Sequence, residues 1–435
     1  MGSSASSART GVNQHRSVAA EGEIMSSSYA YFVGIDWGTE NHQVCVLDGA
    51  GTRKGERSFR HSGKGLLELV GWITRLCSGV QGVAVAIEVP RGAIVESLLE
   101  RQFVVFAINP KQLDRFRDRH TMAGAKDDRL DAFVLADSLR TDRCCYRQLL
   151  IDAPLVIQLR EMSRLDRELG EEVTRLTNRL WDQLKRFWPE ILDLCPSAEE
   201  PWFWALLQLW PTPEKAALAT KRRVQNILTK HRIRRHTSVL VLNTLKAPTL
   251  HVAPGTVEAA SAYLTMLIPR LQLAGTQRRA CEKQLAELLE RISEGNDSDH
   301  VHDVDVIRSF TGIGTRIAAT ILAEAPRAIR ERDYGSLRAH AGVAPVTRQS
   351  GKRARVSFRY GCNHRLRNAV HHWSRVCVQN DERALVHYQA LRKRGHNHAR
   401  ALRGVADRLL KVLMAMLTEG SCYDPGRRKP LLQVS

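Results

Sequence analysis

The strongest constraint on the fold of this chain is the order of strands and helices expected between residues 29 and 139. Apolar or alternating runs predict strands over 29–36, 43–47, 53–60, 83–88 and 103–108, and helical spacing predicts helices over 66–76, 93–101, 112–117 and 124–139. The first three strands are joined by short polar turns, so we expect them to be antiparallel neighbours. Later strands alternate with helices, which is the order of the RNase H-like fold. We therefore expect a mixed α/β domain near the N-terminus.

Four acidic residues stand at matching points of this expected domain. Asp36 ends the first strand and Glu88 ends the fourth. Asp128 and Asp131 are three residues apart on the closing helix, which puts both on one helix face. An acidic pair on a helix is by itself more often a solvated surface. In an RNase H-like sheet, however, the two strands are adjacent and the helix packs across them, so all four carboxylates would converge. Converging carboxylates repel one another and favour divalent cations. We expect two Mg²⁺ or Mn²⁺ ions, which can stabilise the attacking and leaving oxygens in phosphodiester displacement.

The charge balance indicates a polyanionic partner. The chain has 435 residues, a formal net charge of +19 and a pI near 9.9. Nucleic acid is favoured over a membrane surface, because no run of about twenty uninterrupted apolar residues occurs. Nine cysteines without a CxxC pair favour reduced thiols in a cytoplasmic, nucleoid-associated protein over a zinc knuckle or a disulfide framework. The histidines at 371–372 and at 396 and 398 lack the spacing of a metal site, so we interpret them as surface or phosphate-contacting residues.

Two long helical patterns mark the middle of the chain. Between residues 155 and 210, apolar residues recur at threes and fours, as in a coiled-coil seam, until Pro201 and Pro211 interrupt the chain. A second amphipathic pattern over 257–292 predicts a helix that could return antiparallel to the first, and 294–300 has the composition of a linker. The basic run at 220–236 is either a solvated helix face or a phosphate-binding surface. Its candidate phosphate contacts are Lys221, Arg222, Arg223, Arg234 and Arg235.

The last part of the chain opens with a helix, a Gly-Ile-Gly turn and a second helix over 306–324, which is helix-hairpin-helix-like. Gly312 and Gly314 would let backbone N–H groups approach a phosphate at a helix N-terminus, although a plain helix–helix turn could have the same sequence. Further helices are predicted at 336–341, 365–378 and 401–416.

A basic loop is expected over 342–355, and it carries Ser350 directly before a glycine. A serine hydroxyl is a weak nucleophile unless a base or metal activates it and cations stabilise the developing phosphorane charge. The cations next to this serine are Arg348, Lys352, Arg353 and Arg355. A loop serine before glycine is by itself usually a turn residue, and Thr347 and Ser357 are rival hydroxyls.

Several strings taken together resemble one family. They are the four acids in their order, the string at 126–132, the Gly-Ile-Gly turn at 310–314, and the segments 340–345 and 348–352. The combination resembles the DEDD insertion-sequence transposases, the IS-one-ten family of bridge recombinases, over roughly residues 30–140 and 303–378. The middle of the chain shares with that family only its coiled-coil character.

The resemblance implies an active site built from two domains. A RuvC-like domain would supply the metal-binding acids, which are Asp36, Glu88, Asp128 and Asp131. The C-terminal transposase domain would supply Ser350, whose attack on DNA would give a covalent phosphoserine intermediate. A structured bridge RNA encoded by the element would pair with donor and target DNA, and the protein would work as a tetramer built from dimers. Asp127 departs from the family pattern, which has a small hydroxyl residue at this place.

These expectations divide the chain into five segments. They are a disordered N-terminal extension at 1–28, a RuvC-like domain at 29–150, a coiled-coil and basic helical domain at 151–298, a C-terminal transposase domain with the serine at 299–420, and a basic tail at 421–435. Met25 is an alternative start. Two other functions stay open: a RuvC-like, metal-dependent, structure-specific DNA nuclease would need the acids but not Ser350, and a non-catalytic nucleic-acid-binding protein would need neither.

Overall fold

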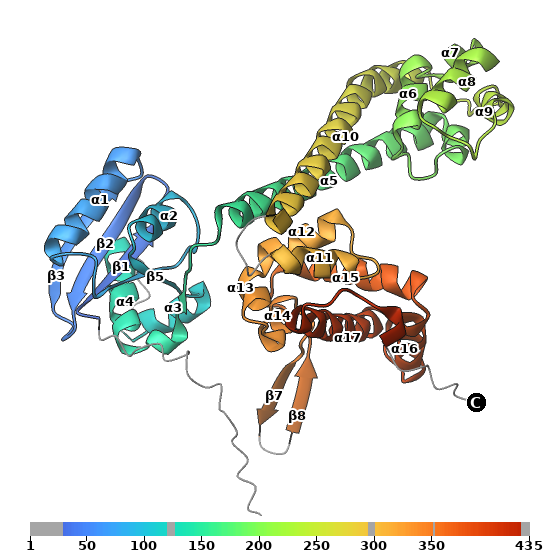
Figure 1. Cartoon of the computed structure of the whole chain (residues 1–435). Coiled ribbons are helices and arrows are strands. Elements are labelled where there is room, and N and C mark those ends of the chain that lie inside the picture. The colour runs from blue at the N-terminus through green and yellow to red at the C-terminus, as the bar shows by residue number, and fades with distance from the viewer. Residues whose placement is uncertain (1–28, 120–126, 295–300, 351–352, 428–435) are drawn as a thin grey trace, which may run out of the picture. The chain divides into compact units, whose positions relative to one another are not determined.

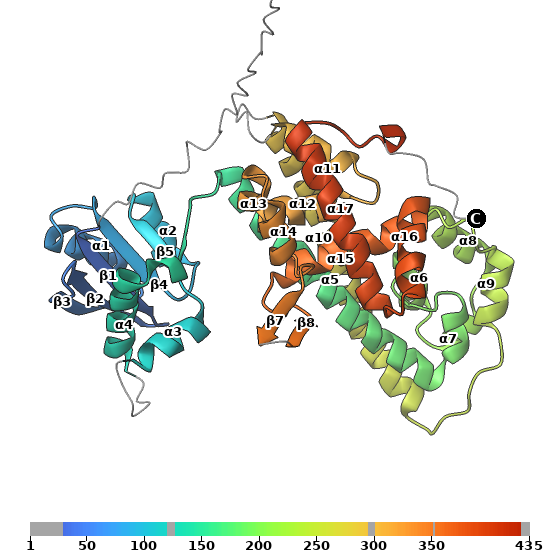
Figure 2. The ribbon, with the colours of Figure 1, turned by 90° about the horizontal axis from the view of Figure 1, so that it is seen from below.

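The computed structural model describes residues 29–119, 127–294, 301–350 and 353–427. The chain divides into two compact units, Met1–Ile151 and Asp152–Ser435, and each is described here by itself (Figures 1 and 2). The expected extension at 1–28 lies outside the described residues, as does the expected linker at 294–300 apart from Glu294, which ends a helix. No helix among the described residues is long and apolar enough to cross a membrane. All nine cysteines are free thiols.

The first unit is a mixed α/β domain built on one six-stranded sheet of order β3-β2-β1-β4-β5-β6. Its strands are β1 (Tyr31–Trp37), β2 (Asn41–Asp48), β3 (Arg53–Arg60), β4 (Val83–Ile87), β5 (Val104–Ala107) and β6 (Arg147–Gln148). Its helices are α1 (Gly63–Leu76), α2 (Ala93–Glu100), α3 (Pro110–Arg117) and α4 (Asp128–Thr141). The first three strands are antiparallel and β1, β4 and β5 are parallel, which is compatible with the expected RNase H-like fold. The two-residue strand β6 was not predicted, because so short a segment has no periodicity.

The sheet is covered on both faces. Val33 and Ile35 of β1 pack in a core with α1 and α2. The alternate residues face the other way, where Phe32 and Ala86 pack with α3 and α4. Gly34 lies opposite Ala86 and against α4 so closely that an added Cβ would be 2.0 Å from the backbone oxygen of Ala132. Only glycine fits there, because backbone atoms cannot move aside as a side chain can.

Two long helices, α5 (Pro154–Phe187) and α10 (Thr256–Glu294), lie side by side in the second unit (Figure 1). They run antiparallel, as the sequence suggested: the Cys281 thiol donates to the Met162 carbonyl at 3.4 Å, whereas Gly170 lies against Arg278. Their packing as a coiled coil stays a prediction. The first helix ends at Phe187 rather than at the prolines farther on.

The far ends of α5 and α10 share a second core with the helices between them. These are α6 (Pro201–Leu209), α7 (Pro213–Ala217), α8 (Lys221–Lys230) and α9 (Ser238–Leu245). Fully buried tryptophans, Trp188 and Trp202, lie in this core.

The rest of the second unit is a helical bundle with one β-hairpin. Its elements are α11 (Val301–Ser309), α12 (Thr315–Glu324), α13 (Pro326–Arg330), α14 (Tyr334–His340), β7 (Val346–Ser350), β8 (Arg353–Ser357), α15 (His364–Asn380), α16 (Glu382–Lys393) and α17 (His398–Glu419). The predicted helices are present, and α13 and α16 are additional ones. The expected loop at 342–355 is wrong, since most of it is the hairpin β7–β8. Both faces of this hairpin are mostly solvent-exposed, so its sequence lacks the apolar alternation that marks a strand.

Candidate functional site: an acidic sheet edge and a serine hairpin

The two strand-end acids are neighbours at one edge of the first unit's sheet. Gly34 and Ala86 lie opposite each other on the parallel strands β1 and β4 and face α4. Asp36 and Glu88 each follow two positions later. Because side chains alternate between faces along a strand, both acids belong to the α4 face. Both are half-buried there.

The direction of α4 brings its first turn to this edge. Phe32 shares a core cluster with Leu139, near the end of the helix, whereas Gly34 lies against Ala132, near its start. Moving along β1 toward Asp36 therefore means moving along α4 toward its N-terminus. The aspartates in the first turn of α4 are Asp128 and Asp131. Three elements thus bring the four predicted acids to one end of the sheet.

The first turn of α4 offsets part of this negative charge. Asp127, the departure from the family pattern, is the N-cap residue, and its carboxylate accepts from the Arg129 N–H at 3.2 Å. An aspartate at this position satisfies a free backbone donor and interacts favourably with the helix dipole. The extra carboxylate therefore has a structural role in helix capping. Asp128 is solvent-exposed.

Asp131 has a cationic partner that sequence reasoning missed. Its side chain is 3% exposed, and its Oδ1 accepts from Arg117 Nε at 2.6 Å. Arg117 also donates to Asp114 at 2.7 Å, and these bonds, the one with Asp131 first, raise the pKa of the arginine. Burying a carboxylate is tolerable when a guanidinium bonds to it. No sequence signal distinguishes Arg117 from the other arginines around it, because the pairing depends on how α3 folds back on α4.

The donor set at this edge fits a hard divalent cation in kind, since carboxylate oxygens are the ligands that Mg²⁺ and Mn²⁺ prefer. Among the described residues, however, no three His, Cys, Asp or Glu side chains lie close enough to share one ion. The Asp131 carboxylate faces Arg117. The elements that carry the acids are therefore adjacent, but the described side chains do not form a complete coordination site.

The hairpin gathers a hydroxyl and three cations on one face. Ser350 is paired with Arg353, and Arg348 is paired with Arg355. Directly opposed residues share a face, and so do residues two apart on one strand, so all four side chains belong to the same face. All four are exposed, and the arginines form no ion pair within the described part of the chain. Two arginines placed opposite each other repel unless an anion lies between them. Lys352 lies outside the described residues.

The same register separates the rival hydroxyls. Thr347 is opposite Val356 and one position out of phase with Ser350, so it lies on the other face of the hairpin. Ser357 is half-buried at the root, where its hydroxyl donates to the Val346 carbonyl at 3.3 Å. Of these three hydroxyls, Ser350 is the exposed one on the arginine face.

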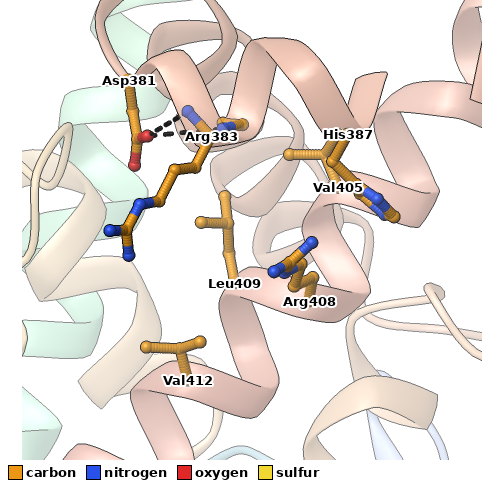
Figure 3. A pocket seen from close by; sticks show the side chains of 8 residues that line it. Asp381, Arg383, His387, Val405, Arg408, Leu409 and Val412 are labelled. Carbon is orange, nitrogen blue, oxygen red and sulfur yellow. Dashed lines mark hydrogen bonds between the residues drawn. The ribbon is translucent and has the colours of Figure 1, made fainter. Parts of the chain in front are cut away.

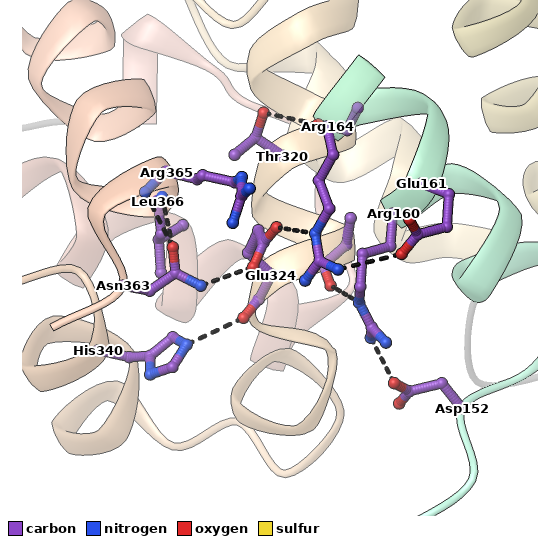
Figure 4. A network of polar contacts seen from close by, with 12 residues as sticks. Asp152, Arg160, Glu161, Arg164, Thr320, Glu324, His340, Asn363, Arg365 and Leu366 are labelled. Carbon is purple, nitrogen blue, oxygen red and sulfur yellow. Dashed lines mark hydrogen bonds and ion pairs between the residues drawn. The ribbon is translucent and has the colours of Figure 1, made fainter. Parts of the chain in front are cut away.

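A polar network around Glu324 fixes both ends of the segment that carries the hairpin (Figure 4). Its Oε2 accepts from Asn363 Nδ2 at 2.6 Å, its backbone oxygen is 3.0 Å from His340 Nε2, and Asn363 N–H donates to the His340 carbonyl at 2.9 Å. Arg164 of α5 donates to the other carboxylate oxygen at 3.2 Å. Burial raises the pKa of Glu324, but the bonds from Asn363 and Arg164 outweigh it and leave the pKa below its ordinary value.

The other predicted phosphate contacts are exposed, but they differ in whether they already form an ion pair. Lys221, Arg222 and Arg223 are exposed in the first turn of α8. Cations at a helix N-terminus oppose the helix dipole, so an anion bound there would be stabilising. Arg234 is exposed, whereas Arg235 is paired with Glu200.

The Gly-Ile-Gly turn has one packed side and one open side. Gly312 has a φ of +84°, and a Cβ on it would lie 3.2 Å from the ring of Trp373. Gly314 is the N-cap of α12 and has open space where its Cβ would be. Position 312 favours glycine for a structural reason: the turn has a positive φ there and packs against α15. Phosphate binding by this turn stays a prediction.

One further hollow is too small for a substrate. A cavity of about 10 Å³ lies beside the start of α16, where Asp381 accepts from the backbone N–H of Arg383 (Figure 3). His387 and Arg408 also line it, and burial, followed by the charge of Arg408, lowers the pKa of His387. This volume accommodates about one water molecule.

Comparison with known proteins finds transposases for the segment that carries the acids and for the segment that carries the hairpin. A family model described as "Transposase" matches residues 33–189, and one described as "Transposase IS116/IS110/IS902 family" matches residues 304–389. The chain is 49% identical over 219 residues to the protein y4uE of Sinorhizobium fredii, named as a candidate transposase, over 49% of this chain and 60% of that protein. It thus spans less than two thirds of that relative. It is 29% identical over 422 residues to the mini-circle protein for IS117 of Streptomyces coelicolor, over 95% of this chain and 100% of that protein.

Proposed function

Because the chain belongs to the IS-one-ten (IS110) family of insertion-sequence transposases, we propose that it is a DNA recombinase that exchanges strands through a covalent Ser350–DNA intermediate. The observation that carries the proposal is the shared hairpin face of Ser350 and the three arginines Arg348, Arg353 and Arg355. An exposed hydroxyl among guanidinium groups that form no ion pair with any described residue suits attack on a phosphodiester. The same face has no evident role in folding, since its side chains are exposed.

The chemistry follows from this arrangement. The Ser350 oxygen forms a bond to phosphorus as its proton leaves, and the bond from phosphorus to one sugar oxygen breaks. The departing sugar oxygen takes up a proton, and the strand end stays attached to the serine. Guanidinium groups on the same face stabilise the extra negative charge of the pentacoordinate phosphorane. Attack by a second strand end on the phosphoserine reverses these steps and joins new partners.

The acidic edge is the second part of the proposed site. Asp36, Glu88, Asp128 and Asp131 would together hold two Mg²⁺ or Mn²⁺ ions. Such ions would stabilise the negative charge on the attacking and leaving oxygens. Asp127 caps α4 and Arg117 neutralises Asp131 in the protein alone. The residue most affected by cation binding would be Asp131, whose carboxylate would exchange a guanidinium for a metal.

We further propose that a structured guide RNA and donor and target DNA are the partners, and that the working form is a tetramer built from dimers. The formal charge of +19 supports a large nucleic-acid ligand. The paired helices α5 and α10 expose large apolar side chains, among them Met266 at 68% and Leu273 at 60%. Exposed apolar residues on long helices support contact with another copy in a coiled coil.

A serine variant gives the direct test. Ser350→Ala should reduce strand exchange and covalent protein–DNA adducts by roughly 10³-fold or more, because the nucleophile is lost. Adducts are measured on denaturing gels with labelled DNA. Thr347→Ala and Ser357→Ala are matched controls that should keep adduct formation. If Ser350→Ala still cuts DNA but forms no adduct, the chain is instead a RuvC-like nuclease.

An acid variant tests the other half. Asp128→Asn should abolish metal-dependent strand exchange and leave RNA binding largely intact, because this side chain is exposed and the substitution disturbs no core. Strand exchange is assayed in Mg²⁺ or Mn²⁺ and RNA binding by gel shift. Unchanged recombination would contradict the metal-binding role.

A further inference from the structure

A cleft at the root of the serine hairpin has the composition of a nucleotide-binding site. It has a volume of about 250 Å³ and lies between the segment that leaves β8 and the helices α15 and α17. Its polar lining is cationic or neutral: Arg367, Asn368, His371 and Arg403. No carboxylate of the described residues lines it. The cleft is far larger than a water site.

The two arginines are held in place without neutralisation. Arg403 lies over the ring of Phe358 at 4.7 Å and Arg367 lies over the same ring at 5.7 Å. Both are half-buried, and neither forms an ion pair in the part of the chain that the structure describes. Holding two partly desolvated cations near each other costs free energy, and a bound anion would offset that cost. Burial and the nearby Arg400 lower the pKa of Arg403, and burial and several neighbouring cations lower the pKa of His371.

An aromatic ring stands beside these cations. Tyr360 is 77% exposed, and its ring meets the Phe358 ring edge-on, with centroids 4.9 Å apart. The faces of an exposed tyrosine ring are available for stacking, and a base offers a flat partner only when it is not stacked inside a duplex. Cations for a phosphate and a ring for a base are therefore adjacent.

We propose that this cleft binds one unpaired nucleotide, with its phosphate at Arg367 and Arg403 and its base stacked on Tyr360. The site rests on the proposed function, and deepens it by giving the serine hairpin a means of positioning a strand. Ser350 is four residues beyond the hairpin root, or roughly 14 Å along an extended strand. A nucleotide in the cleft would thus be a few nucleotides away from the phosphate that the serine attacks.

The site-specific test is photo-crosslinking. Single-stranded DNA and RNA oligonucleotides carrying 5-iodouracil are bound to the full chain, irradiated, and the crosslinked peptides are identified by mass spectrometry. All measurements use the Ser350→Ala chain, which lacks the proposed nucleophile. The result therefore reports on nucleotide binding whether or not the serine mechanism is correct. The expected product joins the base to the peptide that contains Tyr360. A crosslink with DNA alone, RNA alone or both supports the site and identifies the source of the nucleotide. Crosslinks confined to other segments would overturn it.

Variants supply the second measurement. Tyr360→Ala and Arg403→Gln should each weaken binding of single-stranded oligonucleotides by about ten-fold, the scale of one lost stacking or charged contact. Tyr360→Phe, which keeps the ring, and Arg408→Gln, an exposed arginine elsewhere on α17, are matched controls that should change binding less than two-fold. Binding is measured by fluorescence anisotropy, with thermal unfolding as the check on folding. Unchanged affinity in both test variants would overturn the proposal, as would an equal loss for duplex DNA.

Discussion

The carboxylate of Asp131 is almost fully buried, and a buried charge needs a partner at close range. In the protein alone that partner is Arg117, at 2.6 Å. In the proposed function, the same carboxylate would be a metal ligand. These two roles are compatible when the guanidinium stabilises the acid before a cation arrives. Asp131 therefore has two expected states, one paired with Arg117 and one bound to a cation.

Removing the guanidinium should expose this dependence. Arg117→Gln leaves the buried Asp131 charge without its partner and should lower the free energy of unfolding by about 3 kcal/mol. A cation bound at the acids would replace the guanidinium as the partner of Asp131. Excess Mg²⁺ should therefore restore much of the lost free energy of unfolding, and chelating the Mg²⁺ with EDTA should abolish this recovery. Thermal unfolding with and without Mg²⁺ is the measurement.

The matched control is Arg119→Gln, whose exposed partner is Asp142 at 3.1 Å. Surface pairs contribute little, so this variant should change stability by less than about 1 kcal/mol and respond weakly to Mg²⁺. Equal behaviour of the two variants would argue against a cation at the acidic edge.

Gly34 is the residue on which the approach of α4 to β1 depends. In Gly34→Ala the new Cβ would be 2.0 Å from a backbone oxygen, so the helix must shift. We expect a loss of about 3 kcal/mol, measured by chemical denaturation, together with a loss of strand exchange. Gly49→Ala is the control, because nothing lies within 4 Å of its added Cβ. A fully stable Gly34→Ala protein would contradict this packing.

At the scale of elements, the hairpin β7–β8 decides where the serine is presented. Its register puts Ser350 with the arginines and puts Thr347 on the other face. Its root is held by the network around Glu324, which joins α12 to α5 and to the start of α15. The element that carries the proposed nucleophile thus has a fixed base and an exposed, charged end.

Glu324→Gln should loosen that base. We expect a loss of about 2 kcal/mol at pH 7, because the ion pair with Arg164 becomes a hydrogen bond from the guanidinium to a neutral amide. The folded-state pKa of Glu324 lies below its ordinary value of 4.5, so the unfolded chain takes up the proton first as pH falls. Its contribution is complete above the unfolded pKa and disappears as pH falls through the folded one. The difference between wild type and variant should therefore shrink in acid.

Unfolding curves at neutral and acid pH measure this difference. Glu161→Gln is the control, because Glu161 contacts the same Arg164 at 3.0 Å but is 65% exposed. It should have little effect at either pH. A Glu324→Gln loss that does not depend on pH would mean that the carboxylate charge is not what stabilises the hairpin root.

At the scale of the whole molecule, the dominant property is positive charge, and nearly all of the excess lies in the second unit. The formal net charge is +19; exposed cations occur on α8 and on the hairpin, and two half-buried arginines line the cleft between α15 and α17. Several separate surfaces can therefore contact phosphates of one nucleic acid. Such contacts release condensed counterions when they form.

Affinity for RNA and DNA should consequently fall steeply with salt. Between 50 and 200 mM salt we expect a loss of roughly 10³-fold, the scale for six or more phosphate contacts. Anisotropy titrations at several salt concentrations give the slope, and a variant with Lys221, Arg222 and Arg223 changed to Gln should have a shallower one. A flat salt dependence would argue against an extended electrostatic surface.

The sequence alone predicted the strand order of the first unit, the positions of Asp36, Glu88 and Asp131 on its elements, and the two long helices. These features depend on hydrophobic periodicity and on the residues at the ends of helices and strands, and both are set by residues close together in the sequence. The sequence did not predict the hairpin, whose exposed strands have no apolar alternation, nor the bond from Arg117 to Asp131. It also gave no sign of the Glu324 network or of the cleft behind the hairpin. Those arise where segments far apart in sequence meet, as at Arg164 and Glu324, and such contacts are decided by packing in three dimensions.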